Sequence, residues 1–216
     1  VLLWNGLKPA TGIQELARQA RYDLMLAWCL ENDAPNLFLA HHQEDQAETF
    51  LMRLTSGSGA DGLACMSMVF SRKGVRLIRP LLNIPKVRLR ITLEVADQEW
   101  IDDPSNKDPA FTRTNIRKLL DDLKTRNIGP ARLASLVGKF RQLRWCTEEV
   151  TRLAINRGVI IHDTGWANVE TEIIKRLPNA ILRRVIIFLL KTIGGSPYPP
   201  RSKKLDRVIN LIVSEE

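Results

Sequence analysis

The apolar residues between positions 11 and 31 follow the period of an α-helix. They recur at steps of three and four residues, which places them on one expected helix face: Ile13, Leu16, Ala20, Leu24 and Ala27. On another face Gln14, Arg18 and Arg21 line up, so two guanidinium groups point the same way. By itself such a row would be an ordinary solvated polar face. The segment therefore predicts an amphipathic helix that carries two candidate cationic groups.

A short strand and a second helix are expected next. Turn-forming residues occupy 31–36, and the apolar run 37–40 is consistent with a buried strand. The second helix is expected to begin near Glu44. Its expected apolar face is Ala47, Phe50, Leu51 and Leu54. Asp45 and Glu48, three residues apart, share the opposite face.

Farther along the chain, short apolar runs give way to helical patterns. The glycine-rich segment 56–62 permits tight turns, and the run 75–82, stopped by Pro80, predicts another short strand. Helices are then expected over 85–97, 131–155, 178–193 and 202–213. The helix over 131–155 has an expected apolar face of Leu133, Leu136, Val137 and Phe140. The helix over 202–213 has one of Leu205, Val208, Ile209 and Ile212. The pattern predicts an α/β part over 1–126 and a mostly helical part over 127–216.

Composition and charge narrow the class of protein. The 216-residue chain has a globular composition and a formal net charge of +8 at pH 7. Its Lys and Arg residues are concentrated in 72–90, 113–126 and 132–157. Such clustering indicates a polyanionic partner such as RNA. A basic surface that serves only solubility is the alternative.

Cysteine usage argues against a disulfide-stabilised or zinc-knuckle protein, and hydropathy argues against a membrane-spanning one. Cys29, Cys65 and Cys146 are far apart and form no CxxC pair, which argues against a disulfide framework or a zinc knuckle and is typical of a reducing cytoplasm. The most apolar run, 180–190, is too short to span a bilayer and contains two arginines. We therefore expect a cytoplasmic protein without a membrane segment.

The sequence "AHHQED" (40–45) carries the candidate chemistry. His41, His42, Glu44 and Asp45 are metal-ligand types, but they lack the one-turn spacing that a single-metal helix site needs, so we expect no metal held by the protein alone. In open α/β sheets, ligands bind beyond the carboxyl ends of strands, where His42 and Asp45 would lie. An acidic pair there could hold a cationic group, and Arg18 and Arg21 could supply the positive charge that a phosphate needs. The alternative is an acidic helix start that only complements the helix dipole. These residues alone do not decide between the two.

Four segments in one order resemble a known family. They are "GIQELARQARY" (12–22), "AHHQEDQAETFLMRLTSGSGADGLACM" (40–66), "RLIRPLL" (76–82) and "WIDDPSNKDPAFTRTNIR" (100–117). Together they resemble the tRNA(Ile)-lysidine synthetase family of PP-loop ATP pyrophosphatases, over most of residues 3–120. The resemblance implies a partial Rossmann-like parallel sheet domain, akin to the adenine nucleotide alpha hydrolases, over 1–126. It also implies a helical tRNA-docking domain over 127–216.

The resemblance also implies a reaction. ATP, with Mg²⁺, adenylates the C2 oxygen of the wobble cytidine in a tRNA(Ile) with a CAU anticodon, and the amine of L-lysine then displaces AMP. Arg18 and Arg21 would stabilise charge on the α-phosphate, and Asp45 and Glu48 would bind the lysine ammonium. Asp45 could also accept its proton. His42 would shape the same pocket. The residues matching family positions that face nucleotide or tRNA phosphates are Arg79, Arg113 and Arg117. A homodimer is possible in this family.

The chain departs from the family pattern at three places. Glu44-Asp45 stands where the family usually has two Asp residues, and Ser56 stands where an Arg usually precedes Gly-Ser-Gly. The family's SGGxDS loop, which grips the ATP phosphates, would lie upstream of "LLWNG" (2–6). We therefore expect an incomplete form of the enzyme that does not bind ATP properly as it stands. Two alternative hypotheses are another PP-loop enzyme, such as a tRNA thiolase, and a non-catalytic RNA-binding module.

Overall fold

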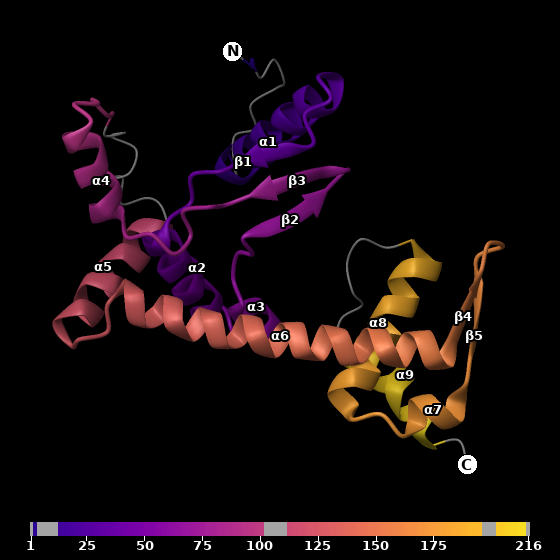
Figure 1. The fold of residues 1–216 in the computed structure, drawn as a ribbon. Coiled ribbons are helices and arrows are strands. Elements are labelled where there is room, and N and C mark those ends of the chain that lie inside the picture. Colours follow the sequence, from indigo (N-terminus) through magenta and orange to yellow (C-terminus); the bar gives the residue numbers. More distant parts are fainter. Residues whose placement is uncertain (1, 4–12, 102–111, 196–201, 215–216) are drawn as a thin grey trace. The chain divides into compact units, whose positions relative to one another are not determined.

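The computed structural model describes residues 2–3, 13–101, 112–195 and 202–214 of the chain (Figure 1). Their contacts divide the chain into two compact units, Val1–Arg141 and Gln142–Glu216. Among the described residues no helix is both long and apolar enough to cross a membrane. Each unit has its own core, so each is described by itself.

The first unit combines a small sheet with several helices. Its elements in chain order are α1 (Ile13–Glu31), β1 (Asn36–Phe38), α2 (Gln43–Thr55), α3 (Ala60–Leu63), β2 (Val69–Arg72), β3 (Val75–Ile78), α4 (Lys86–Val95), α5 (Thr112–Thr125) and the start of α6 (Pro130–Gly158). The predicted helices and the two predicted strands of this part all form, with shifts of a few residues at their ends. The strand expected over 75–82 ends at Ile78, before Pro80.

The sheet is mixed rather than purely parallel, which corrects the expectation from the sequence. Its strand order is β1-β3-β2, with β1 parallel to β3 and β2 antiparallel to β3. β2 and β3 form a hairpin around Lys73 and Gly74, whose φ angles are +50° and +83°. Two consecutive positive φ angles match the two-residue hairpin turns that follow the twist of the strands. Because β2 is mostly exposed, it lacks the apolar pattern that identified its neighbours.

Helix α1 packs against β1 and β3 through a face other than the predicted one (Figure 1). Its buried residues are Tyr22, Leu26 and Cys29, which form a core cluster with Val75 and Leu77 of β3. By contrast, Leu16 of the predicted face is 46% exposed. Apolar residues at three- and four-residue spacing occur on both sides of this helix, so the period alone did not identify the side that meets the sheet.

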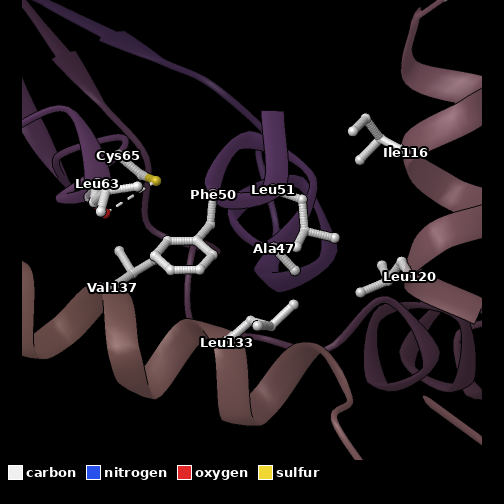
Figure 2. Close-up of a cluster of buried hydrophobic side chains, with 9 residues drawn as sticks. All are labelled: Ala47, Phe50, Leu51, Leu63, Cys65, Ile116, Leu120, Leu133 and Val137. Carbon is white, nitrogen blue, oxygen red and sulfur yellow. Dashed lines mark hydrogen bonds between the residues drawn. The ribbon is translucent and has the colours of Figure 1, made fainter. Parts of the chain in front are cut away.

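A second cluster in this unit fixes the position of α2. Phe50 points from α2 toward Val137 of α6, and the side chains of α5 approach α2 from another side (Figure 2). The cluster comprises Ala47, Phe50, Leu51, Leu63, Cys65, Ile116, Leu120, Leu133 and Val137. The expected apolar faces of α2 and α6 are confirmed here except at their rims, since Leu54 is 50% and Leu136 38% exposed. The side chain of Gln46, also on α2, forms two hydrogen bonds with the backbone of Met66. It donates to the Met66 carbonyl oxygen and accepts from the Met66 amide.

The second unit is helical around a small hairpin. It contains the end of α6, the antiparallel strands β4 (Val159–His162) and β5 (Trp166–Val169), then α7 (Thr171–Lys175), α8 (Asn179–Gly194) and α9 (Ser202–Ser214). Its core includes Ile174, Val185, Leu205 and Ile209. The predicted apolar face of α9 is confirmed, since Leu205 and Ile209 are buried and Val208 and Ile212 pack beside them. The hairpin and α7 were not foreseen, because strands of four residues carry little periodicity.

The division between the two units falls inside α6. The sequence pattern places the end of the α/β part near residue 126, whereas the contacts divide the chain after Arg141. The reason is that Leu133 and Val137, in the first turns of α6, complete the core around α2. The start of α6 therefore belongs to the first unit.

Candidate functional site

The polar residues of "AHHQED" gather at the N-terminus of α2. The backbone amide of His42 donates to Asp45 Oδ2 at 2.9 Å, so Asp45 caps the start of its own helix. The imidazole of His42 lies between two carboxylates, with Nδ1 3.1 Å from Glu44 Oε2 and Nε2 3.6 Å from Asp45 Oδ2. Glu44 Oε2 also accepts the backbone amide of Lys86 at 2.9 Å. Glu44 thereby ties the start of α2 to the start of α4.

Glu48 lies one turn farther along α2 and is buried. The Nε of Arg117 in α5 donates to Glu48 Oε1 at 2.7 Å, and the Glu48 side chain is 7% exposed. Within the described parts of the chain, Glu48 Oε2 is buried and accepts no hydrogen bond. An unsatisfied buried carboxylate oxygen is costly unless a donor reaches it. Glu48 therefore has one oxygen bound by Arg117 and one that can accept a further hydrogen bond.

The Glu48–Arg117 pair gives a testable prediction about stability. Replacing Glu48 by Ala leaves the guanidinium of Arg117 without its 2.7 Å partner. We expect the free energy of unfolding to fall by about 1–3 kcal/mol, less than for a fully buried pair because the Arg117 side chain is 37% exposed. Urea unfolding followed by circular dichroism measures the loss.

The matched control for Glu48→Ala is Glu149→Ala, which breaks the pair between Glu149 and Arg152 on α6. Both of those side chains are at least 41% exposed, so their pair is expected to contribute little to stability because solvent screens it. Equal losses for the two substitutions would contradict a stabilising role for the Glu48–Arg117 pair.

A cavity of about 290 Å³ lies where β1 ends. Arg18 and Arg21 of α1 line it together with Leu39, Ala40 and His41. It therefore occupies the position beyond a strand's carboxyl end where α/β sheets bind ligands. Two guanidinium groups and an imidazole at one opening suit an anionic group such as a phosphate.

A second cavity, of about 180 Å³, lies between α1 and the β2–β3 hairpin. Arg18 lines this cavity as well, together with Arg72 and Arg79. Arg79 follows β3 directly, is 7% exposed, and donates from Nη1 to the carbonyl oxygen of Ser67 at 3.0 Å. Both cavities are thus basic.

Hydrogen bonds to Asp23 join the hairpin to α1 beside the second cavity. The side chain of Gln19 donates to Asp23 at 2.8 Å, and Lys73 Nζ does so at 3.1 Å. These hydrogen bonds, that of Gln19 foremost, hold the pKa of the Asp23 carboxyl below its ordinary value. Asp23 is therefore a carboxylate at neutral pH and lies 3.8 Å from Arg72.

The structure brings some of the residues singled out in the sequence together and separates others. Arg18 and Arg21 share one cavity, Arg18 and Arg79 share the other, and Glu48 meets Arg117. Asp45 and Glu48 are not among the residues that line either cavity. The side chain of Arg113 lies outside the described residues.

Sequence reasoning missed two residues of these cavities, His41 and Arg72. Of the adjacent histidines it selected His42, whereas His41 lines the cavity with Arg18 and Arg21 and His42 turns toward Asp45. The alternation of side chains along an extended segment was the signal that could have separated them. Arg72 had no comparable signal, because β2 itself was not foreseen.

The candidate site of this unit contains charged groups of both signs. Guanidinium groups converge on the cavities, while the carboxylates of Asp45 and Glu48 lie on α2, whose first residues follow His41. Among the described residues, no three His, Cys, Asp or Glu side chains gather as a set of metal ligands. The two basic cavities suit an anion, whereas the carboxylates of α2 that could bind a cation line neither of them.

Comparison with known proteins extends this description. A family model described as a PP-loop domain matches residues 4–123. The tRNA(Ile)-lysidine synthase of Wolbachia sp. subsp. Brugia malayi (strain TRS) is 33% identical over 216 residues, which is all of this chain and 50% of that protein. The protein of the same name from Ruegeria pomeroyi is 38% identical over 200 residues, covering 93% of this chain and 48% of that protein.

A third relative of that name, from Methylobacterium nodulans, is 34% identical over 219 residues, covering 97% of this chain and 62% of that protein. The likeness therefore continues beyond the PP-loop match into the helical second unit. The chain spans about half the length of the first relatives it matches.

Proposed function

Because this chain belongs to the PP-loop domain family, we propose that it is part of an ATP-dependent tRNA(Ile)-lysidine synthase. Such an enzyme joins L-lysine to C2 of the wobble cytidine in a tRNA(Ile) with a CAU anticodon, forming a carbon–nitrogen bond and releasing AMP and pyrophosphate. One observation carries the proposal: the likeness to proteins of that name covers the whole chain, both units included. The geometry of the first unit supports it at three points.

The first point is the cavity at the end of β1. A carbonyl oxygen is a poor leaving group, so the cytidine C2 oxygen must first be adenylated, and negative charge grows on the α-phosphate in that step. Arg18 and Arg21 line one cavity and can direct their guanidinium groups at such a phosphate. His41 lines the same opening and adds hydrogen-bonding capacity there. We assign these residues to the adenylation step.

The second point is the acidic face of α2. Lysine arrives as an ammonium ion and must lose a proton before its nitrogen can attack. Asp45 stands in the first turn of α2, and Glu48 keeps one buried oxygen without a hydrogen bond in the described part of the chain. Two carboxylates can bind the ammonium by charge-assisted hydrogen bonds, and Asp45 can accept the proton. His42, held against Asp45, fixes the orientation of that carboxylate.

The third point concerns the remaining arginines. Arg79 lines the second cavity and is assigned to a nucleotide or tRNA phosphate. Arg117 is engaged by Glu48, so we assign it first to positioning that carboxylate and only then to tRNA phosphates. Arg113 is assigned to phosphate on the resemblance alone.

ATP is the expected substrate of a PP-loop domain, and Mg²⁺ is its expected companion. The described residues do not build a protein-only site for that ion, since no three metal-binding side chains gather among them. Mg²⁺ commonly takes one or two carboxylates and completes its shell with substrate phosphates and water. When bound with ATP, Mg²⁺ would neutralise phosphate charge.

Residues 1–126 are proposed to belong to the catalytic domain, and the helical part over 127–216 is proposed to help dock tRNA. A homodimer in the cytoplasm is proposed from the family. A tRNA thiolase is a weaker alternative, because such enzymes use paired cysteines whereas Cys29 and Cys65 are both buried. A non-catalytic RNA-binding module would leave the free oxygen of Glu48 without a purpose.

A lysine-incorporation assay tests the function. The intact protein is incubated with ATP, labelled lysine, and transcripts of tRNA(Ile) with a CAU anticodon or of tRNA(Met). We expect label in the isoleucine transcript only, and only when ATP is present. Label in neither transcript, with RNA still bound, would favour the non-catalytic module. Loss of label from a transcript whose wobble cytidine is replaced by uridine locates the reaction.

A further inference from the structure

The cavity between α1 and the β2–β3 hairpin shares Arg18 and Tyr22 with the cavity at the end of β1, but its other lining residues are different. Arg72 and Phe70 of β2 and Arg79 after β3 line it, together with Arg18 and Tyr22 of α1. Neither Arg72 nor Phe70 has a place in the adenylation or lysine-binding steps. The cavity therefore needs an account of its own.

Arg79 is the most informative of these residues. Its side chain is more than nine-tenths buried, and Nη1 donates to the Ser67 carbonyl oxygen. Its Nε, by contrast, is buried and has no acceptor among the residues that the structure describes. A buried guanidinium with an unused donor is costly unless a ligand supplies the acceptor. Arg79 also lines the cavity, so its guanidinium group borders the space that an anion would enter.

The balance of charge identifies the chemistry of that acceptor. Three guanidinium groups line the cavity, and no carboxylate is among its described lining residues. Asp23 offsets only Arg72, at 3.8 Å, and shares its carboxylate with Lys73. The net charge at the cavity is therefore positive, and an anion with several oxygens would satisfy more than one guanidinium at once.

The aromatic residues add a second feature. The ring of Tyr22 lies under the guanidinium groups of both Arg18 and Arg72, at 5.6 Å and 5.8 Å from their central carbons. Tyr22 is buried and contacts both cations, which holds them at the same cavity. Phe70 at the rim is 54% exposed, which leaves a ring available for stacking. Phosphate oxygens beside a stacked base are the two parts of a nucleotide.

We propose that this cavity is a subsite for one phosphate group of a nucleotide, and that the phosphate belongs to the RNA backbone. Its volume of about 180 Å³ is well above the roughly 10–15 Å³ that holds one water, and below the about 300–1,000 Å³ of sites for whole small molecules. A single phosphate fits this size better than a complete ATP. Arg72 and Arg79 bind its oxygens, Arg18 borders both this cavity and the one at the end of β1, and Phe70 stacks on the neighbouring base. The choice of RNA rests on the proposed function.

Arg72→Gln tests the subsite in the intact protein. Fluorescence anisotropy measures binding of two labelled transcripts, the tRNA(Ile) with a CAU anticodon and a tRNA of unrelated sequence, over a range of salt concentrations. We expect roughly tenfold weaker binding of both transcripts, because a backbone phosphate carries no sequence information. The slope of log Kd against log salt should become smaller by about 0.7–0.9.

Lys73→Gln is the matched control. It removes one positive charge from the next position and one contact to Asp23, but Lys73 does not line the cavity. We expect it to leave the affinity within about twofold of wild type, because an exposed charge outside the contact adds little. Phe70→Ala is the second variant, which should weaken binding roughly tenfold without changing the salt slope. Thermal melting verifies that each variant is folded.

The outcomes separate the two sources of phosphate. Equal effects of Arg72→Gln and Lys73→Gln on RNA binding would overturn the subsite. A weaker affinity for ATP in Arg72→Gln, with RNA binding unchanged, would overturn the assignment to RNA and give the phosphate to the free nucleotide. If wild-type protein fails to incorporate lysine while Arg72→Gln still weakens RNA binding, the proposed function fails and the subsite stands.

Discussion

Replacing Asp45 by Asn is expected to lower kcat/KM for lysine by about 10²–10⁴-fold, the range for loss of a positioned acid–base group. The substitution separates two roles of this side chain. An amide oxygen can still accept the hydrogen bond that the His42 backbone now donates to Asp45 at 2.9 Å, so the start of α2 should persist. What is lost is the negative charge that would bind the lysine ammonium and accept its proton.

Two measurements locate the defect in the lysine step. Pyrophosphate release that depends on tRNA should continue in Asp45→Asn, because adenylation is assigned to Arg18 and Arg21. Incorporation of labelled lysine should be lost. The neighbouring Glu44→Gln is the matched control: its carboxylate accepts the backbone amide of Lys86, a bond that Gln can retain, so we expect nearly full incorporation. Full lysine-dependent turnover by Asp45→Asn would rule out the role assigned to Asp45.

Replacing Phe50 by Ala is expected to reduce the free energy of unfolding of the first unit by about 3–5 kcal/mol. Phe50 is 5% exposed and lies in the cluster that joins α2 to α5 and α6 (Figure 2). Its ring centroid is 6.2 Å from that of Phe140. Removing the ring costs both the transfer of its surface to water and the cavity that remains. Urea unfolding followed by circular dichroism measures the change.

Leu54→Ala is the control for that prediction. It also truncates an apolar side chain of α2, but Leu54 is 50% exposed, so we expect a loss below about 1 kcal/mol. A similar loss for both substitutions would contradict the assignment of Phe50 to the core. Phe50→Leu should recover part of the loss, because it restores much of the volume. Since α2 carries Asp45 and Glu48, lysine incorporation should decline with the folded fraction.

The core around α2 explains how one of two carboxylates that are close in the sequence comes to lie beside an arginine of the distant helix α5. Ala47, Phe50 and Leu51 bury one side of the helix, and this leaves Asp45 and Glu48 on other sides. Arg117 of α5 then reaches Glu48, because Ile116 and Leu120 of the same helix pack in the cluster. The packing that stabilises the unit is therefore also what orients the carboxylates.

Local patterns were sufficient for the elements that bury a single strong face. The period of three and four residues predicted α2 and α9 with their buried residues, because one face of each is apolar and the rest is polar. The same reasoning was wrong for the buried face of α1, where Tyr22, Leu26 and Cys29 meet the sheet instead of the predicted row. Apolar residues on two sides of a helix leave the choice to the sheet that packs against it.

Short strands were the other elements that the patterns missed. β2, β4 and β5 have four residues each, and none of them has a buried residue, whereas the predicted strand β3 has two. Their formation depends on pairing with a partner strand through backbone hydrogen bonds, which side-chain patterns do not record. The correction matters for function, because β2 supplies the arginine and phenylalanine of the second cavity.

The amino-acid sequence by itself determined the helices with one apolar face, the family through four ordered motifs, and the candidate residues Arg18, Arg21, Asp45 and Glu48. Only the tertiary structure decided that His41 rather than His42 joins the two arginines, that Glu48 pairs with an arginine 69 positions later, and that Arg79 is buried with an unused donor. The physical reason is the separation along the chain of the residues that interact. Helix periodicity and turn chemistry act between residues a few positions apart, whereas ion pairs and cavities form between segments that only the packed core brings together.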